Sequence, residues 1–203
     1  MKPKLCIASM NPGKLEELNR LLGDFFELLS LKDFPTVPEA DEPYDDFLRN
    51  AASKARHYAS ATNMLTLSED AGLCVDTLDG FPGVFTKRFI TQSKGLTNAY
   101  NQLEELLSIK SDRGAYFTCE AVFYDPVHDC YFRGQGIMSG KISFPARGDH
   151  GFGFDPVFVP EHYEQTIAEL GPKVKQTIGH RGQAIRALLE NYQRHHVADI
   201  PLS

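Results

Sequence analysis

Several features that would place a protein in a special class are absent from this sequence of 203 residues. No apolar run approaches the roughly 18 residues that a membrane-spanning helix needs, and the first residues lack the pattern of a signal peptide. The cysteines stand too far apart for a CxxC metal site or a disulfide framework; they are Cys6, Cys74, Cys119 and Cys130. We therefore expect a soluble, cytoplasmic protein with reduced thiols and no membrane partner.

An excess of positive charge is also missing. The chain has 21 lysines and arginines against 27 aspartates and glutamates, which gives a net charge of −6. Binding along a nucleic-acid polymer needs a basic surface, so this composition argues against such a partner. It does not exclude a small anionic ligand held by a few local cations. The length and the 42% of hydrophobic residues suit one large domain, or one domain with two lobes.

The N-terminal segment predicts a strand, a polar turn and a helix in that order. Residues 4–8 are apolar, and the polar residues 9–14 precede leucines at helical spacing. Asn11 is placed to cap the helix with Pro12 at its first position, and the amide groups at such a terminus attract phosphate. Lys14 adds a positive charge there. The spacing is not that of a Walker A loop, and a capped helix with a solvated lysine is the alternative.

Two adjacent carboxylates follow the next apolar segment. Residues 64–67 predict a strand, so Glu69 and Asp70 would stand where the strand leaves the core, with Gly72 allowing the backbone to turn. Such a pair can hold a divalent cation, and one member can accept a proton from water. The alternative is a polar strand end followed by an ordinary turn.

An acidic segment at residues 39–46 runs into a helical pattern that ends near residues 62–63. Acidic residues before a helix are expected from the helix dipole alone, and the competing interpretation is that one of them reaches a metal. Lys54 lies on the same helix and could face either solvent or a phosphate.

Glycines and aromatic residues alternate in residues 148–158, where they would let a flat ligand approach, with Asp155 as a hydrogen-bonding group. A glycine-rich turn whose phenylalanines belong to the core is the alternative. A cluster of donors follows, which a solvated helix entry would also explain; its members are Lys173, Lys175, His180 and Arg181. Other segments predict a strand at 26–31, a helix at 97–107, an antiparallel strand pair at 115–124 and 130–137, and a final helix from 183 to about 192.

Together and in this order, these segments resemble the inosine triphosphate pyrophosphatase family, also called Ham1-like or non-canonical purine NTP pyrophosphatases. The matching motifs span residues 4 to about 192, which is nearly the whole chain. They are Ser9-x-Asn11-x-x-Lys14, Ser68-Glu69-Asp70-x-Gly72-Leu73, Gly80-x-Pro82-Gly83, Gly151-Phe152-Gly153-Phe154-Asp155-Pro156, Ala168-Glu169-Leu170, and Lys175 ahead of His180-Arg181-Gly182-Gln183-Ala184.

The resemblance implies an elongated α/β fold with a central mixed β-sheet, and two lobes that flank a nucleotide-binding cleft within one domain over residues 1–203. It also implies Mg²⁺ as the cofactor and a homodimer. The implied catalytic residues are Asp70 and Lys14, and the implied metal ligands are Asp70, Glu69 and Glu42. The implied substrate-binding residues are Ser9, Met10, Asn11, Pro12, Gly13, Lys14, Ala71, Phe152, Gly153, Phe154, Asp155, Lys175, His180 and Arg181.

By this resemblance the reaction would be hydrolysis of ITP, dITP or XTP to the nucleoside monophosphate and pyrophosphate. Asp70 would act as the general base, and residues 152–155 with Lys175 and the 180–181 pair would line the base pocket. Two rivals remain: a nucleotide-binding regulatory protein without turnover, and a Maf-type pyrophosphatase acting on other modified nucleotides. The chain departs from the family pattern at Ala71, Gly179 and Arg49.

Overall fold

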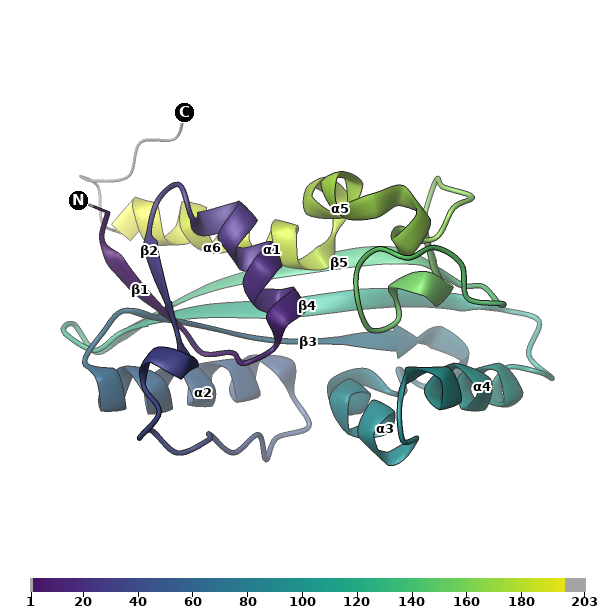
Figure 1. Cartoon of the computed structure of the whole chain (residues 1–203), viewed down its shortest axis with the longest axis horizontal. Coiled ribbons are helices and arrows are strands. Elements are labelled where there is room, and N and C mark those ends of the chain that lie inside the picture. The colour runs from purple at the N-terminus through teal and green to yellow at the C-terminus, as the bar shows by residue number, and fades with distance from the viewer. Residues whose placement is uncertain (1, 196–203) are drawn as a thin grey trace. The chain divides into compact units, whose positions relative to one another are not determined.

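The computed structural model describes residues 2–195 and shows an α/β fold with one six-stranded mixed sheet (Figure 1). The strand order is β2-β1-β3-β4-β5-β6. The strands are β1 (Lys4–Ile7), β2 (Glu27–Ser30), β3 (Thr66–Val75), β4 (Gly114–Asp125), β5 (Cys130–Ile142) and β6 (Phe158–Pro160). The helices are α1 (Pro12–Leu22), α2 (Phe47–Thr62), α3 (Thr86–Gln92), α4 (Leu96–Leu106), α5 (Ile167–Ile178) and α6 (His180–His195).

The first three strands explain where a ligand site can form. β1 pairs in parallel with β2 on one side and with β3 on the other. The chain therefore leaves β1 toward one neighbour and later returns to the other, so the strand order reverses beside β1. In open α/β sheets, ligands bind outside the carboxyl ends of the strands at such a reversal. Here that position is the segment between β1 and α1, residues 8–11.

The second half of the sheet is antiparallel. β4 and β5 are neighbours in the sheet and are separated by only four residues, 126–129. Because parallel strands need a much longer crossover, this connection makes the two strands antiparallel. β5 and β6 are antiparallel as well, with Gly140 opposite Pro160. The antiparallel pair expected from the sequence is thus confirmed, although β5 continues to Ile142 rather than ending near residue 137.

The chain divides into two compact units. Among the described residues, the first, unit 1, comprises residues 2–70, 119–136 and 181–195, and the second, unit 2, comprises residues 71–118 and 137–180. The lobes and the cleft expected from the family pattern stay a prediction.

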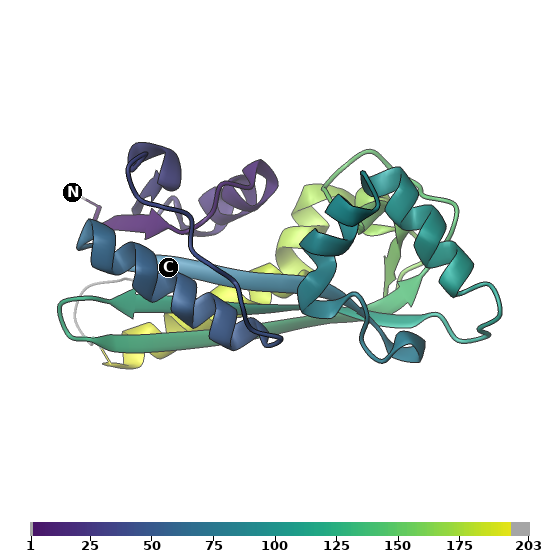
Figure 2. The same ribbon diagram turned by 90° about the horizontal axis from the view of Figure 1, so that it is seen from below.

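In unit 1, helices cover both faces of the sheet. Alanines of α2 pack against Val122 and Tyr124 of β4. Phe123, which lies between these two, contacts Phe26 and Tyr192 instead. Since successive side chains of a strand point to opposite faces, α2 lies on one face and α6 on the other (Figure 1), and Figure 2 shows α2 in front of the strands. α1 lies on the same side as α6 (Figure 1).

Unit 2 has a hydrophobic core of its own. Its buried members come from β3, β4 and β5, from α3, α4 and α5, and from the segment before β6. The large, fully buried side chains among them are Leu73, Leu103, Leu107, Phe154, Phe158 and Ile167.

Two expectations from the sequence are wrong. The chain does not turn at Gly72, because β3 runs through this residue without interruption. Gly72 is needed for a close approach, since a Cβ there would lie 2.2 Å from the carbonyl oxygen of Gly83. The last helix begins at His180 rather than at residue 183. It follows α5, whose first residues are capped by Thr166 and whose course is broken at Gly171.

No helix of residues 2–195 is long and apolar enough to cross a membrane.

Candidate active site

The turn after β1 builds a helix N-terminus of the expected kind. Asn11 caps α1, and its Oδ1 accepts hydrogen bonds from the amides of Gly13 (3.0 Å) and Lys14 (3.3 Å). The Asn11 amide donates to the hydroxyl of Ser9 (3.2 Å), and Pro12 occupies the first helical position. A phosphate bound at this terminus would take over amide groups that the Asn11 side chain now satisfies.

Behind this turn lies a buried cluster of charges centred on Glu69. Its carboxylate lies 3.0 Å from the ammonium of Lys14 and 2.5 Å from the guanidinium of Arg181. Arg181 also pairs with Glu17, one turn beyond Lys14 on α1. Glu69 and Arg181 are almost completely buried. Arg181 therefore joins α6 to β3 and α1 through ion pairs, and it does so within unit 1.

The charges of this cluster stabilise one another. Burial alone would raise the pKa of the Glu69 carboxyl, but Arg181 and Lys14 outweigh it and hold this pKa well below its usual range. Burial alone would lower the pKa of Lys14, and the Glu69 carboxylate reverses that effect. The pKa of Arg181 is raised in the same way by Glu69 and Glu17. All three groups are therefore ionised around neutral pH.

Cys119 completes the surroundings of Glu69 and was not predicted from the sequence. Its Sγ lies 3.5 Å from the Glu69 carboxylate. Burial, followed by the nearby negative charge of Glu69, raises the pKa of this thiol well above its usual value. The thiol is thus protonated and donates to the carboxylate. No sequence motif marks this residue, whereas the spacing of Lys14 and Glu17 on one helix face could have indicated that they share an environment.

Asp70 has different neighbours. Its Oδ2 accepts a hydrogen bond from Asn50 Nδ2 (3.1 Å), and Asn50 is fixed by two hydrogen bonds of 3.0 Å with the backbone of Tyr44. Burial raises the pKa of Asp70 above its usual value, with a contribution from Glu42, although Lys54 and Lys14 oppose the rise. Glu42 and Lys54 form an ion pair with each other. Asp70 is therefore a carboxylate of increased basicity.

The structure does not bring Glu69 and Asp70 together on one side. They are successive residues of an uninterrupted strand, so their side chains point to opposite faces of the sheet. Their partners agree with this, because those of Glu69 belong to α1 and α6, whereas Asn50 belongs to α2 on the other face (Figure 1). A cation held by both carboxylates at once, as the sequence suggested, does not fit this arrangement.

The donor groups of the site limit how a metal ion could be held. Within residues 2–195 there is no group of three or more His, Cys, Asp or Glu side chains that could enclose a metal ion. Mg²⁺ needs no such enclosure, because it commonly keeps several waters and binds one or two carboxylates together with substrate phosphates. Asp70 and Glu42 are the candidate carboxylates: the charge of Glu42 contributes to the raised pKa of Asp70, and Glu42 is paired with one cation, Lys54. Glu69 fits less well, because two cations already neutralise it.

A second group of candidate residues belongs to unit 2. The Asp155 carboxylate accepts from the ammonium of Lys175 (2.6 Å) and from the amide of Phe152 (2.7 Å). The same ammonium lies 4.2 Å from the centre of the Phe152 ring, a cation–π contact. Asp155 and Lys175 are almost completely buried. Gly151 has a positive φ of 80°, and a Cβ there would lie 2.1 Å from Asp155 Oδ2, so only glycine fits beside this carboxylate.

The remaining predicted residues separate into core and surface positions. His180 stacks on Phe117 with ring centres 4.9 Å apart. The Phe154 ring is buried in the core of unit 2, where it stacks on Phe89, so the structure favours a packing role for it. The Gly153 carbonyl accepts a hydrogen bond from the hydroxyl of Tyr100. Ala71 is half-buried in β3, and Met10 is exposed.

Comparison with solved structures first identifies the class of fold. A HAM1 protein from Coxiella burnetii has a similar structure, with a TM-score of 0.84 and 33% sequence identity over 97% of this chain and 100% of the other. A nucleoside-triphosphatase, or dITP/XTP pyrophosphatase, from Mycobacterium abscessus gives a TM-score of 0.73 with 36% identity over 91% of this chain and 97% of the other.

Sequence comparison then identifies the family. The model of the Ham1 family matches residues 5–191, and the chain belongs to this family. Two relatives named dITP/XTP pyrophosphatase, from Exiguobacterium sp. and Caulobacter vibrioides, are 39% and 37% identical to it. The alignments cover 91% and 93% of this chain and 94% and 97% of the relatives.

Proposed function

We propose that this protein hydrolyses non-canonical purine nucleoside triphosphates, namely dITP, XTP and ITP, to the nucleoside monophosphate and pyrophosphate. The observation that carries the proposal is a buried carboxylate of raised pKa, Asp70, in the unit that also holds a capped helix N-terminus with Lys14. The relatives named dITP/XTP pyrophosphatase support the same reaction.

The triphosphate would bind at the start of α1. The backbone amides of Gly13 and Lys14 and the positive end of the helix dipole favour phosphate oxygens, and the Lys14 side chain supplies a charge. Glu69 and Arg181 would act on Lys14 rather than on the substrate. Because Glu69 is buried between the two cations, it keeps the ammonium of Lys14 charged and restricts its position. Such preorganised charge stabilises a phosphoryl-transfer transition state without reorganisation during the reaction.

Asp70 would take the proton from the attacking water. The water oxygen forms a bond to the α-phosphorus, the bond from that phosphorus to the bridging oxygen breaks, and pyrophosphate leaves with the electron pair. A general base works best when its pKa approaches the working pH, and the raised pKa of Asp70 moves it in this direction. Asn50 orients the carboxylate by its hydrogen bond.

Mg²⁺ is proposed as the cofactor, held by Asp70 and Glu42, where it would neutralise charge on the phosphate oxygens. The charges of the site support a need for a cation. Unit 1 contributes three cationic groups and four acidic ones to it: Lys14, Lys54 and Arg181, against Glu17, Glu42, Glu69 and Asp70. A triphosphate would add further negative charge to a set that is already slightly negative.

Recognition of the base is proposed for the group around Asp155 in unit 2. Hypoxanthine and xanthine carry an oxygen acceptor at the 6-position, where adenine carries an amino donor. Donors such as Lys175 and His180 pair with the oxygen, and an amino group in its place would leave them unpaired. A site that depends on such hydrogen bonds can reject the wrong base by several orders of magnitude.

A homodimer and a cytoplasmic location also belong to the proposal, because the family pattern implies the first and the composition favours the second. Sedimentation of the full chain tests the dimer, and fractionation of cells tests the location.

The main test is the release of pyrophosphate from ITP, dITP, XTP, GTP, ATP, dTTP and UTP, each with and without Mg²⁺. Rapid release from the first three in the presence of Mg²⁺ is expected. Equal slow release from all seven would rule out base selection, and nucleotide binding without any release would favour a regulatory protein. Preference for modified pyrimidine nucleotides would favour the Maf-type alternative.

A further inference from the structure

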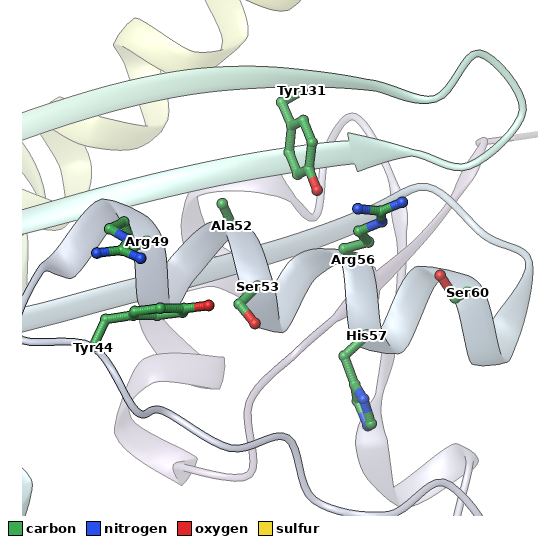
Figure 3. A pocket seen from close by; sticks show the side chains of 8 residues that line it. All are labelled: Tyr44, Arg49, Ala52, Ser53, Arg56, His57, Ser60 and Tyr131. Carbon is green, nitrogen blue, oxygen red and sulfur yellow. The ribbon is translucent and has the colours of Figure 1, made fainter.

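An open pocket with a volume of about 530 Å³ lies beside α2 in unit 1, with Tyr131 of β5 opposite the helix (Figure 3). This volume is within the usual range for small-molecule sites. Residues of α2, of the segment before it and of β5 line the pocket. The hydrogen-bonding residues used below are two arginines, two serines and two tyrosines: Arg49, Arg56, Ser53, Ser60, Tyr44 and Tyr131.

The lining of the pocket is positively charged, in contrast to the protein as a whole. None of its lining residues is acidic, although the chain as a whole has a net charge of −6. Arg49 lies over the ring of Tyr44, with 4.1 Å from its guanidinium carbon to the ring centre. Within the described part of the chain, neither Arg49 nor Arg56 forms an ion pair with a carboxylate. Both guanidinium groups therefore keep donors available for an anion.

The hydroxyl groups between the arginines extend this row of donors. Ser53 and Ser60 make no side-chain hydrogen bond with any residue from 2 to 195. Positions 49, 53, 56 and 60 fall on one face of a helix, and Figure 3 shows Tyr131 facing that row from β5. The result is a line of donors along α2 with an aromatic side chain opposite.

This face differs from the one that serves the candidate active site. Asn50 and Lys54 of α2 reach Asp70 and Glu42. They stand about 100° further around the helix axis than Arg49 and Ser53, respectively. The pocket thus uses residues of α2 that the proposed reaction leaves without a role.

We propose that this pocket binds an oligophosphate, meaning a chain of two or three phosphates, either free or as part of a nucleotide. Guanidinium groups pair with phosphate oxygens in a planar, bidentate manner, and serine hydroxyls add neutral donors. Arg49 and Arg56 are seven residues apart, which is about 10 Å along the helix. A single phosphate therefore reaches one of them, whereas a chain of phosphates reaches both. The inference does not depend on the proposed reaction.

The test is an NMR titration of the ¹⁵N-labelled full chain in EDTA with sodium tripolyphosphate, pyrophosphate and orthophosphate. The amides of Ser53 and Ser60 report on the pocket, and those of Gly13 and Lys14 report separately on the start of α1. We expect tripolyphosphate to shift the Ser53 and Ser60 signals at lower concentration than pyrophosphate, and orthophosphate to be the weakest. Absence of shifts at Gly13 and Lys14 would count against the proposed function and not against this pocket.

The variant with Arg49→Glu and Arg56→Glu should weaken binding at Ser53 at least about tenfold, because each charge-assisted hydrogen bond contributes about as much as a tenfold change in affinity. The Gly13 signals should respond as before. Arg88→Glu is the matched control, since this exposed arginine also lies over an aromatic ring, that of Phe85. It should leave the titration unchanged.

Three results would overturn the proposal: Ser53 shifts that persist in the double variant, orthophosphate or sulfate binding as tightly as tripolyphosphate, and association of two copies through this face that tripolyphosphate does not disrupt. A titration with ATP under the same metal-free conditions distinguishes the sources. Tighter binding than tripolyphosphate supports a nucleotide, and equal or weaker binding supports a free oligophosphate.

Discussion

The two units each contain a buried ion pair at a candidate site, but the pairs differ in balance. In unit 2 one carboxylate, Asp155, meets one ammonium, Lys175, beneath the ring of Phe152. In unit 1, Glu69 meets two cations, and a further buried carboxylate, Asp70, follows it in the chain. The pair in unit 2 joins one negative and one positive group, whereas the cluster in unit 1 contains several interacting charges.

This difference suits two different tasks. A neutral buried pair holds donors in fixed positions, which is what discrimination between bases requires. A cluster with several charges shifts pKa values in opposite directions, as seen for Glu69 and Asp70. Carboxylates whose environments separate their pKa values commonly have separate roles in catalysis. We therefore assign charge positioning to Glu69 and proton transfer to Asp70.

The largest expected effect comes from Asp70→Asn. The amide keeps the shape but cannot accept the proton from water, so turnover of dITP at saturating Mg²⁺ should fall by about 10²- to 10⁴-fold. Steady-state pyrophosphate release measures this. The thermal midpoint should not fall, because the change removes a buried charge. Turnover close to that of the unchanged protein would refute the role of Asp70 as the base.

The next effect is on stability. Glu69→Gln removes the carboxylate shared by the buried Arg181 and the partly exposed Lys14, and loss of one partner from a buried pair costs about 3–5 kcal/mol in the free energy of unfolding. Urea denaturation measures it. Glu16→Gln is the matched control, because it removes an exposed ion pair of α1 with Arg20 that is worth only about 0.3–0.5 kcal/mol. Equal losses in the two variants would contradict the central place given to Glu69.

A change in unit 2 should act on selectivity. Lys175→Gln removes the ammonium beside Asp155 and with it a charged donor, so the preference for XTP over ATP, measured as the ratio of kcat/KM values, should fall about tenfold. Lys173→Gln, an exposed position of the same helix, is the control and should leave the ratio unchanged. A fall in kcat that is equal for both nucleotides would show that Lys175 serves turnover instead.

The smallest expected effect is a change in the pH dependence of stability, measured on the metal-free protein. The pKa of Glu69 lies below its unfolded value of 4.5, so its stabilisation is fully present above about pH 4.5 and is lost as the pH falls toward the folded value. Asp70 contributes to the pH dependence of stability in the opposite direction, because its raised pKa favours the folded state at low pH. In acid denaturation curves, Glu69→Gln should therefore reduce the loss of stability on acidification, and Asp70→Asn should increase it.

Those parts of the fold that depend on neighbouring residues were predictable from the sequence. Asn11 and Pro12 mark the start of α1, because capping is decided within three residues. The same holds for α2, which begins after the cap Asp46 and ends at Asn63 in the left-handed conformation.

Those parts that depend on distant residues were not predictable. Gly72 looked like a turn residue, yet its need for glycine comes from the Gly83 carbonyl, which approaches it within a strand. Arg181 looked like a donor for a base, but its partner Glu69 is 112 positions away in the chain. Neither relation leaves a periodic pattern that sequence reasoning could detect.

Because β3 is uninterrupted, the position of each acidic residue along the strand determines the face of the sheet to which its side chain points. Side chains alternate with a period of two, so deletion of a single residue between Thr66 and Ser68 would exchange the faces. Asp70 would then take the position that faces Lys14, and Glu69 would point to the face of the sheet that α2 covers. The composition of the motif would be unchanged while both chemical assignments were lost, which means that the spacing from the start of the strand, as well as the Glu-Asp pair itself, specifies the site.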